Sequence, residues 1–203
     1  MEFQTVRFRR GVLFAVLAIL GGGADLWTKH AVFQWRGLPG SRDIYWVIDG
    51  YFGIQTAVNI GAVFGIGAGK GWLFAALSVL AAIGVVIWLF FFEAASSKWL
   101  TVAMGFVMGG IAGNLYDRLG IWWQPGYPDQ WQTGVRDWIL WQASDQWRWP
   151  NFNIADSLLV TGAIMLMMHS FQHELASSNE LTSSPVDDRD GTSVATPHSK
   201  SES

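Results

Sequence analysis

The protein has 203 residues, of which 51% are hydrophobic and 14% are charged, and its formal net charge at pH 7 is -3. This composition is too apolar and too poor in charge for an ordinary soluble domain, so it favours an integral membrane protein. The acidic balance provides no basic surface for nucleic acid, and the absence of cysteine excludes thiol nucleophiles, disulfides and cysteine-ligated metals.

Four apolar segments have the length of membrane-spanning helices, because about 20 apolar residues cross about 30 Å of hydrocarbon. They cover residues 11–33, 71–94, 99–119 and 152–171. The first segment follows three arginines and ends in a Gly-Gly-Gly-Ala run at 21–24, so a cleavable secretory signal is an alternative interpretation. Cleavage would leave the two termini on opposite faces and would remove the helix that holds Asp25 and Lys29, so we favour a retained helix.

Charge and turn length predict the topology of these helices. Residues 95–98 form a tight turn that contains Lys98, and positive charge favours the cytoplasmic side. Together with Arg7, Arg9 and Arg10 before the first helix, this turn predicts cytoplasmic amino and carboxyl termini and two outer loops. Four arginines in those outer loops depart from the charge rule, so the orientation needs support from other features.

The segments outside the helices differ in composition. The first outer loop, 31–70, contains an aromatic and β-branched run at 51–58 that fits either a short strand or plain interfacial anchoring. The second, 120–151, is rich in Trp, Gln, Pro and Gly, and we expect it to be irregular and to lie at the interface. From residue 176 onward Ser, Thr, Asp, Glu and Pro dominate, which predicts a disordered cytoplasmic tail.

The predicted fold class is therefore an all-α membrane protein with four transmembrane helices and a small extracytoplasmic β-rich element. The membrane domain covers 1–175 and the tail covers 176–203. In the third helix, Gly105, Gly109 and Gly113 stand at four-residue steps, so one face lacks side chains and another helix can approach closely.

Polar residues are costly in hydrocarbon, so their positions are informative. They collect at the predicted outer ends of three helices: Asp25, Thr28, Lys29, Asn114, Asp117, Arg118, Asn153, Asp156 and Ser157. The topology above brings these ends to one membrane face. For Asp25, Lys29 and Asp117 we favour ion pairing with each other or with Arg118. Asp156 has no basic residue within one turn, and N-capping of its helix is the structural alternative for it.

Five segments in order resemble the motifs of one enzyme family. They are 25–29 (Asp-Leu-Trp-Thr-Lys), 59–64 (Asn-Ile-Gly-Ala-Val-Phe), 109–119 (Gly-Gly-Ile-Ala-Gly-Asn-Leu-Tyr-Asp-Arg-Leu), 135–139 (Val-Arg-Asp-Trp-Ile) and 152–157 (Phe-Asn-Ile-Ala-Asp-Ser). In this order, with four helices between them, they resemble the lipoprotein signal peptidases, also called type II signal peptidases. The resemblance covers residues 11–171.

This resemblance implies an aspartic endopeptidase of the bacterial inner membrane that acts near the extracytoplasmic face. Its substrates would be prolipoproteins whose cysteine carries diacylglycerol, and cleavage would occur just before that cysteine, with membrane lipids as neighbours and no metal or other cofactor. The motifs imply that Asp137 and Asp156 are the catalytic pair. They also imply a substrate-binding or supporting role for Asn59, Asn114, Arg118 and Asn153, and a framework role for Asp25, Lys29 and Asp117.

The sequence departs from the family pattern near the first of these aspartates. Residues 120–134 separate the third-helix motif from the next motif, where the family usually has only a few residues. We expect this insert to form either a lid or a rim contact. Trp138 replaces a Phe of the family motif, and Arg136 replaces an apolar residue.

Other chemistries fit the residue inventory less well. The sequence has no His-Glu-x-x-His and no Gly-x-Ser-x-Gly motif. His169 and His173 are four residues apart and could bind a metal, but an interaction of their charge with the helix carboxyl terminus is favoured. The rival enzyme mechanism is a dyad of Ser157 and Lys29. A lipid- or peptide-binding chaperone, or a transporter, is the rival function of another class.

Overall fold

The computed structural model describes residues 2–61, 67–92, 97–144 and 146–183. The helices are α1 (Glu2–Arg36), α2 (Gly71–Phe91), α3 (Lys98–Arg118) and α4 (Ile154–Ser183), with a short 3-10 helix, η3 (Asp129–Trp131). The strands are β1 (Tyr45–Ile48), β2 (Phe52–Asn59), β3 (Val135–Ser144) and β4 (Trp147–Arg148). Residues 1–169 form one compact unit, which contains every contact discussed below.

The described residues contain four helices that are long and apolar enough to cross a membrane, at Thr5–Arg36, Gly71–Phe91, Lys98–Arg118 and Ile154–Gln172. Large apolar side chains on α2 and α4 are exposed, for example Leu80, Ile83 and Ile164. Such faces suit contact with lipid tails, which do not drive apolar side chains inward as water does. The predicted four-helix membrane fold is confirmed.

The helix boundaries differ from the apolar segments. The first helix begins before residue 11 because its arginines are good helix formers, and Arg7 Nη2 donates a hydrogen bond of 2.7 Å to the Phe90 carbonyl near the end of α2. The Gly-Gly-Gly-Ala run lies inside this continuous helix. Residues 93–96, which include most of the predicted turn, lie outside the described residues.

The glycine face of α3 packs against α1, as predicted. A Cβ added at Gly109 would lie 3.2 Å from both the Ala18 carbonyl oxygen and the Gly22 nitrogen, and a Cβ at Gly105 would lie 2.8 Å from the Leu17 Cβ. The two backbones are therefore too close for larger side chains at these positions.

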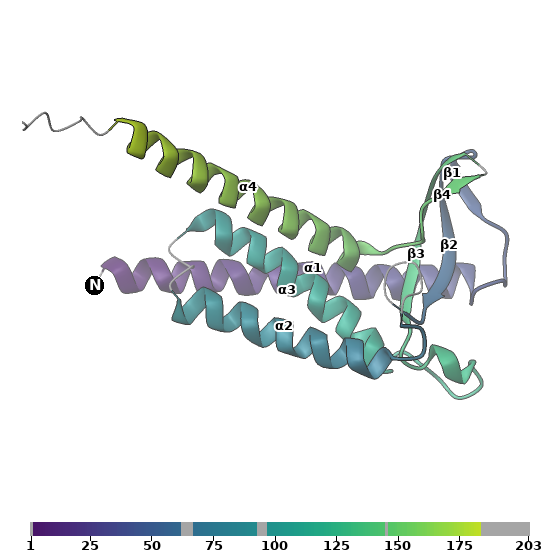
Figure 1. Cartoon of the computed structure of the whole chain (residues 1–203). Helices are drawn as coiled ribbons and strands as arrows, with labels where there is room; N and C mark the ends of the chain where they lie inside the picture. The colour runs from purple at the N-terminus through teal and green to yellow at the C-terminus, as the bar shows by residue number, and fades with distance from the viewer. Residues whose placement is uncertain (1, 62–66, 93–96, 145, 184–203) are drawn as a thin grey trace, which may run out of the picture. The chain divides into compact units, whose positions relative to one another are not determined.

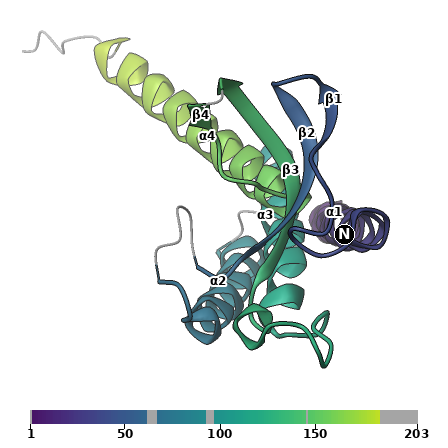
Figure 2. The same ribbon diagram turned by 90° about the vertical axis from the view of Figure 1, so that its right-hand side faces the viewer.

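An antiparallel sheet in the order β1-β2-β3-β4 lies at the end of the helices away from the amino terminus (Figure 1). Figure 2 looks onto this sheet with the helices behind it. The strand predicted at 51–58 is confirmed as β2, which pairs with β3 so that Ala57 faces Asp137 and Asn59 faces Val135.

The expectation of an irregular second outer loop is wrong for residues 135–144, which form β3. Most of β3 from Val135 to Leu140 is buried on both faces, so its side chains do not show the alternation of a half-exposed strand. Two charged residues, Arg136 and Asp137, also interrupt its apolar character. The composition of this segment therefore does not indicate a strand.

The last helix also differs from the prediction. It begins at Ile154, while Phe152 forms an isolated bridge with Ile139 of β3. It continues to Ser183, so the first part of the predicted tail is helical, and residues 184–203 lie outside the described residues. His169 lies within α4, so its predicted place at the helix carboxyl terminus is wrong; the side chain of His173 lies outside the described residues.

Candidate active site

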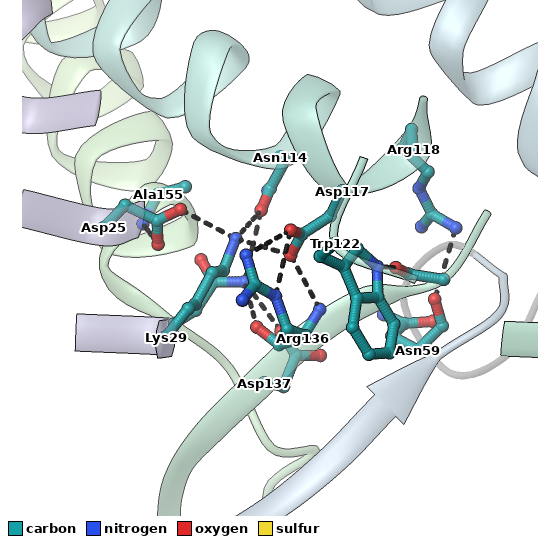
Figure 3. A network of polar contacts seen from close by, with 12 residues as sticks. Asp25, Lys29, Asn59, Asn114, Asp117, Arg118, Trp122, Arg136, Asp137 and Ala155 are labelled. Carbon is teal, nitrogen blue, oxygen red and sulfur yellow. Dashed lines mark hydrogen bonds and ion pairs between the residues drawn. The ribbon is translucent and has the colours of Figure 1, made fainter. Parts of the chain in front are cut away.

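Three fully buried charged residues join α1 to α3 (Figure 3). Lys29 Nζ lies 2.7 Å from Asp25 Oδ2 and 3.2 Å from Asp117 Oδ2. The same ammonium group donates a hydrogen bond of 3.0 Å to Asn114 Oδ1. Buried charges are tolerated only when they are paired, so each of these three depends on the others. The predicted pairing of Asp25 and Asp117 with Lys29 is present.

Asp117 has a second cationic partner that sequence reasoning missed. The Nε and Nη2 atoms of Arg136 donate to Asp117 Oδ1 at 3.0 and 2.7 Å, and the Arg136 backbone N–H donates to Asp117 Oδ2 at 2.9 Å. The Arg136 guanidinium also lies over the rings of Trp122, Phe33 and Tyr116, with centroid distances of 5.3, 6.0 and 6.0 Å. Such contacts are worth about 2 kcal/mol when water is excluded.

Arg118 was a predicted partner of these carboxylates, but it donates to backbone carbonyls instead. Its Nη1 donates to Asn59 at 3.2 Å and to Thr133 at 2.9 Å, and its Nη2 donates to Gly61. The guanidinium therefore ties the residues after β2 to those before β3. The Asn59 side chain accepts a hydrogen bond of 3.0 Å from the Gly61 N–H, which forms a local turn.

Asp156 stands in the first turn of α4, and Asn153 immediately precedes this helix. The Asn153 Oδ1 atom accepts from the Asp156 N–H at 2.9 Å, and Asp156 Oδ2 accepts from the Asn153 N–H at 3.2 Å. This reciprocal arrangement is a capping box, so the capping role considered for Asp156 is real. Its other oxygen, Oδ1, accepts from Asn114 Nδ2 at 2.8 Å, which ties the same carboxylate to α3.

Asp137 lies on β3 and is 2% exposed. Its Oδ1 accepts a hydrogen bond of 2.6 Å from Asn153 Nδ2, so the Asn153 side chain contacts both the Asp137 carboxyl group and the Asp156 backbone N–H. Burial raises the pKa of Asp137 well above its ordinary value, and the nearby Asp156 carboxylate raises it further. Lys29 and the Asn153 hydrogen bond act on this pKa in the opposite direction.

A cavity of about 370 Å³ lies against this network. Its described lining combines polar residues (Asn59, Ser78, Asn114, Arg118, Asp156) with apolar ones (Gly61, Phe74, Leu77, Ala81, Ile111, Val135, Leu159). Helices α2, α3 and α4 contribute, together with the paired residues Asn59 and Val135 at one end of the β2–β3 pair. Asp156 lines the cavity directly, while Asp137 is joined to Asp156 through Asn153. A cavity with one carboxylate and an apolar wall suits an amphipathic ligand.

The predicted site residues come together in one place. Seven of them share a continuous network of hydrogen bonds and ion pairs: Asp25, Lys29, Asn114, Asp117, Asp137, Asn153 and Asp156. Arg118 and Asn59 lie beside it at the cavity wall. The residue missed was Arg136, whose charge at a position that is apolar in the family motif was the available signal. Among the described residues, no group of three or more His, Cys, Asp and Glu is placed to hold a metal ion.

The arrangement does not bring the rival Ser-Lys dyad together. Lys29 is engaged by two carboxylates and by Asn114. The Ser157 hydroxyl donates a hydrogen bond of 3.0 Å to the Asn153 carbonyl, as a serine in the first turn of a helix often does. Ser157 and Lys29 therefore have separate partners.

Comparison with known proteins gives consistent matches. A family model described as signal peptidase (SPase) II matches residues 15–172. A lipoprotein signal peptidase of Rhodopirellula baltica is 65% identical over 193 residues, which cover 92% of this chain and 86% of the relative. A lipoprotein signal peptidase of Pseudomonas syringae pv. tomato is 38% identical over 130 residues, which cover 62% of this chain and 68% of the relative.

Two solved structures described as bacterial membrane enzymes have a similar fold. One superimposes with a TM-score of 0.66 at 24% identity and covers 86% of this chain and 94% of its own. The other gives a TM-score of 0.62 at 25% identity and covers 77% of this chain and 90% of its own. The arrangement of helices and sheet therefore recurs in solved structures.

Proposed function

The chain belongs to the signal peptidase II family, and from that premise we propose that it is an aspartic endopeptidase in which Asp137 and Asp156 activate water to cleave diacylglyceryl-modified prolipoproteins just before the lipidated cysteine. Family membership makes the protein a membrane peptidase that removes signal peptides from prolipoproteins. The aspartic mechanism and the cleavage position are the parts that we add. The observation that supports the aspartic mechanism most is that one residue, Asn153, donates to both carboxyl groups, from Nδ2 to Asp137 Oδ1 and from its backbone N–H to Asp156 Oδ2.

An aspartic peptidase needs two carboxyl groups that share one proton, because neighbouring like charges disfavour full ionisation. The raised pKa of buried Asp137 supports this residue as the protonated partner. Asp156 is suited to be the ionised partner, since it lies in the first turn of α4 and accepts hydrogen bonds from Asn114 and from the Asn153 N–H. The pair nevertheless titrates as a unit.

In the proposed reaction, Asp156 takes a proton from water while the water oxygen attacks the scissile carbonyl carbon. Asp137 gives its proton to the carbonyl oxygen, which forms a tetrahedral diol. The diol collapses when a proton passes from the carboxyl pair to the leaving nitrogen of the cysteine, the carbon–nitrogen bond breaks, and one diol hydroxyl returns its proton to the pair. The signal peptide then leaves with a new carboxyl terminus, and the pair again holds one proton.

The cavity supports the proposed substrate. Near Asp156 its lining offers the side chains of Asn59, Asn114 and Arg118, which we assign to the substrate backbone and to the orientation of the pair. Phe74, Leu77 and Leu159 form part of its apolar wall, which suits the acyl chains of a lipidated cysteine and of membrane lipids. Asp25, Lys29 and Asp117 keep the ends of α1 and α3 in register behind this surface.

We further propose that the protein lies in the bacterial inner membrane with both termini in the cytoplasm. Lys98 begins α3, and Arg7, Arg9 and Arg10 lie near the start of α1, which places positive charge on the proposed inner side. The carboxylate pair and the sheet would then face the extracytoplasmic side. Residues 176–203 remain a predicted cytoplasmic tail.

The test is incubation of the purified protein, in detergent or lipid, with a diacylglyceryl-modified prolipoprotein, followed by mass spectrometry of the products. We expect two fragments whose masses correspond to cleavage just before the modified cysteine. The Ser157→Ala variant should give the same fragments, because its hydroxyl only bonds the Asn153 carbonyl. Loss of cleavage in this variant would favour the Ser-Lys dyad, and binding without any cleavage would make the protein a lipoprotein-binding factor instead.

A further inference from the structure

Arg136 is a buried cation that the proposed reaction does not use. It is 6% exposed, and it directly precedes Asp137 on β3. Two of its guanidinium nitrogens donate to a single oxygen of Asp117. These two hydrogen bonds fix the orientation of the guanidinium as well as its position, because its donors lie in a rigid plane.

The backbone of Arg136 is held by Asp117 of α3 and by Asn153, which precedes α4. Its N–H donates to Asp117 Oδ2 on α3 at 2.9 Å, and its carbonyl accepts from Asn153 Nδ2 at 3.4 Å. That carbonyl belongs to the peptide group that leads into Asp137, and the same Asn153 nitrogen donates to Asp137 Oδ1. The position of the Asp137 carboxyl group therefore depends on how firmly Arg136 is held.

One residue of the 120–134 segment, Trp122, packs against the guanidinium, which also lies over Phe33 and Tyr116. Trp122, which is 9% exposed, lies 5.3 Å from the guanidinium carbon by its ring centroid, and Figure 3 shows it beside Arg136. Its Nε1 donates a hydrogen bond of 2.9 Å to the Gly134 carbonyl, two residues before Arg136. The Trp122 ring also contacts Phe33 of α1, at 6.1 Å between centroids. The segment thus folds back onto the start of β3.

The same segment does not close over the cavity. None of the described residues that line the cavity belongs to 120–134. It is linked to the cavity wall through the Thr133 carbonyl, which accepts from Arg118. These contacts are those of a brace for β3, rather than those of a lid.

We propose that Arg136 is a positioning residue for Asp137, and that residues 120–134 serve as a brace that holds Arg136 through Trp122. The inference rests on the proposed function only in its effect on catalysis. Its structural part, the restraint of the backbone at Asp137, is independent of what the protein cleaves.

Trp122→Ala and Trp123→Ala form a matched pair, because Trp123 lies in the same segment but donates to the Pro128 carbonyl instead of covering Arg136. We expect Trp122→Ala to lower kcat on prolipoprotein by about 10- to 100-fold through misplacement of Asp137, with KM within about twofold. Trp123→Ala should stay close to wild type. A rise in KM with kcat unchanged would show that the segment contacts substrate, and would overturn the proposal.

Arg136→Gln provides a readout that loss of packing alone would not change. The charged groups around Asp137 are Asp156 from α4, Lys29 from α1, and Asp117 and Arg118 from α3. Removal of the Arg136 cation leaves the negative charge of Asp117 less compensated, which favours the protonated form of Asp137. The basic limb of the pH–kcat profile should therefore move to higher pH, whereas Arg136→Lys should keep the wild-type limb. An unmoved limb in folded Arg136→Gln protein would contradict the proposal.

Hydrogen exchange separates this inference from the function. In the full chain without substrate, backbone amides at the start of β3 should exchange faster in Trp122→Ala than in Trp123→Ala. Faster exchange in Trp122→Ala, together with a wild type that does not cleave prolipoprotein, would support the brace and contradict the proposed function. Equal exchange in the two variants would contradict the proposed brace, whether or not the wild type cleaves prolipoprotein.

Discussion

Asn153 illustrates how one residue can serve the fold and the site together. It caps α4 by accepting from the Asp156 N–H, and its amide nitrogen donates to Asp137, to Asn114 and to the Arg136 carbonyl. A single planar amide therefore fixes the relative places of α3, β3 and α4. Because its oxygen and nitrogen have fixed partners, the amide has only one orientation that satisfies the network.

The stability of the protein should depend on pH through the buried carboxyl group of Asp137. Because burial raises the pKa of Asp137, the folded protein holds a proton there that the unfolded chain releases at lower pH. The stability that this proton provides is complete below the ordinary carboxyl pKa of about 3.9. It is lost as pH rises through the raised value. We expect the wild type to lose stability relative to Asp137→Asn over that window.

The measurement is thermal unfolding of both proteins in the same detergent across a series of pH values. The difference in Tm, Asp137→Asn minus wild type, should increase as pH rises and should level off above the raised pKa. The other titratable groups are common to the two proteins, so they largely cancel in the difference. A difference that stays flat would mean that Asp137 is not a buried proton-binding group.

Sequence reasoning at the residue scale found the polar groups but not all of their partners. Asp25, Lys29 and Asp117 were expected to pair, because charges in apolar helices must do so, and their ion pairs are present. Arg136 could not be placed in the same way. Its role depends on β3 lying against α3, a contact between residues 19 positions apart in the chain that no local pattern encodes.

At the scale of elements, the glycines of α3 decide how closely α1 can approach. The prediction here is that Gly113→Ala lowers both stability and activity, because a Cβ at this position would meet the Asp25 carboxylate that pairs with Lys29. Overpacking of this kind costs about 1 to 3 kcal/mol. Displacement of Asp25 would also disturb its hydrogen bond of 2.9 Å from the Ala155 N–H at the start of α4.

Gly84→Ala on α2 is the matched control, because no atom lies within 4 Å of a Cβ added there. Alanine is a better helix former than glycine by up to about 1 kcal/mol, so this variant should be as stable as the wild type or more stable. Thermal unfolding and prolipoprotein cleavage report on both variants. Equal behaviour of the two would mean that close packing at Gly113 does not hold the site.

The elements themselves were predicted unevenly. The four helices follow from apolar length alone, which requires no knowledge of their neighbours. The strand β2 showed a recognisable aromatic and β-branched run. By contrast, β3 is buried by contacts with β2 and with the helix ends, so tertiary structure rather than local sequence decides its conformation.

At the scale of the whole molecule, the orientation in the membrane is the main open prediction. The chain has no cysteine, so single cysteines can be introduced without a background of native thiols. Asp49→Cys lies in the exposed turn between β1 and β2, and Lys98→Cys lies at the exposed start of α3. In intact cells, a membrane-impermeant maleimide should label the first variant and not the second.

Permeabilised cells supply the control, since both cysteines should then react. Labelling of Lys98→Cys in intact cells, with Asp49→Cys protected, would invert the topology and place the carboxylate pair on the cytoplasmic side. That result would contradict the proposed site of lipoprotein processing. The ordered motifs indicated the family correctly, but motifs alone do not report the side of the membrane.

The pairing of Asp137 with Asp156 is the central claim, and single-turnover cleavage of a diacylglyceryl-modified prolipoprotein tests it most directly. Asp137→Asn and Asp156→Asn should each lower the rate by about 10²- to 10⁴-fold, as expected when one member of an acid–base pair is removed. Asp129→Asn, an exposed aspartate in the 120–134 segment, should stay within about twofold of wild type. If either dyad variant is folded and cleaves at the rate of Asp129→Asn, the two aspartates do not form the catalytic pair.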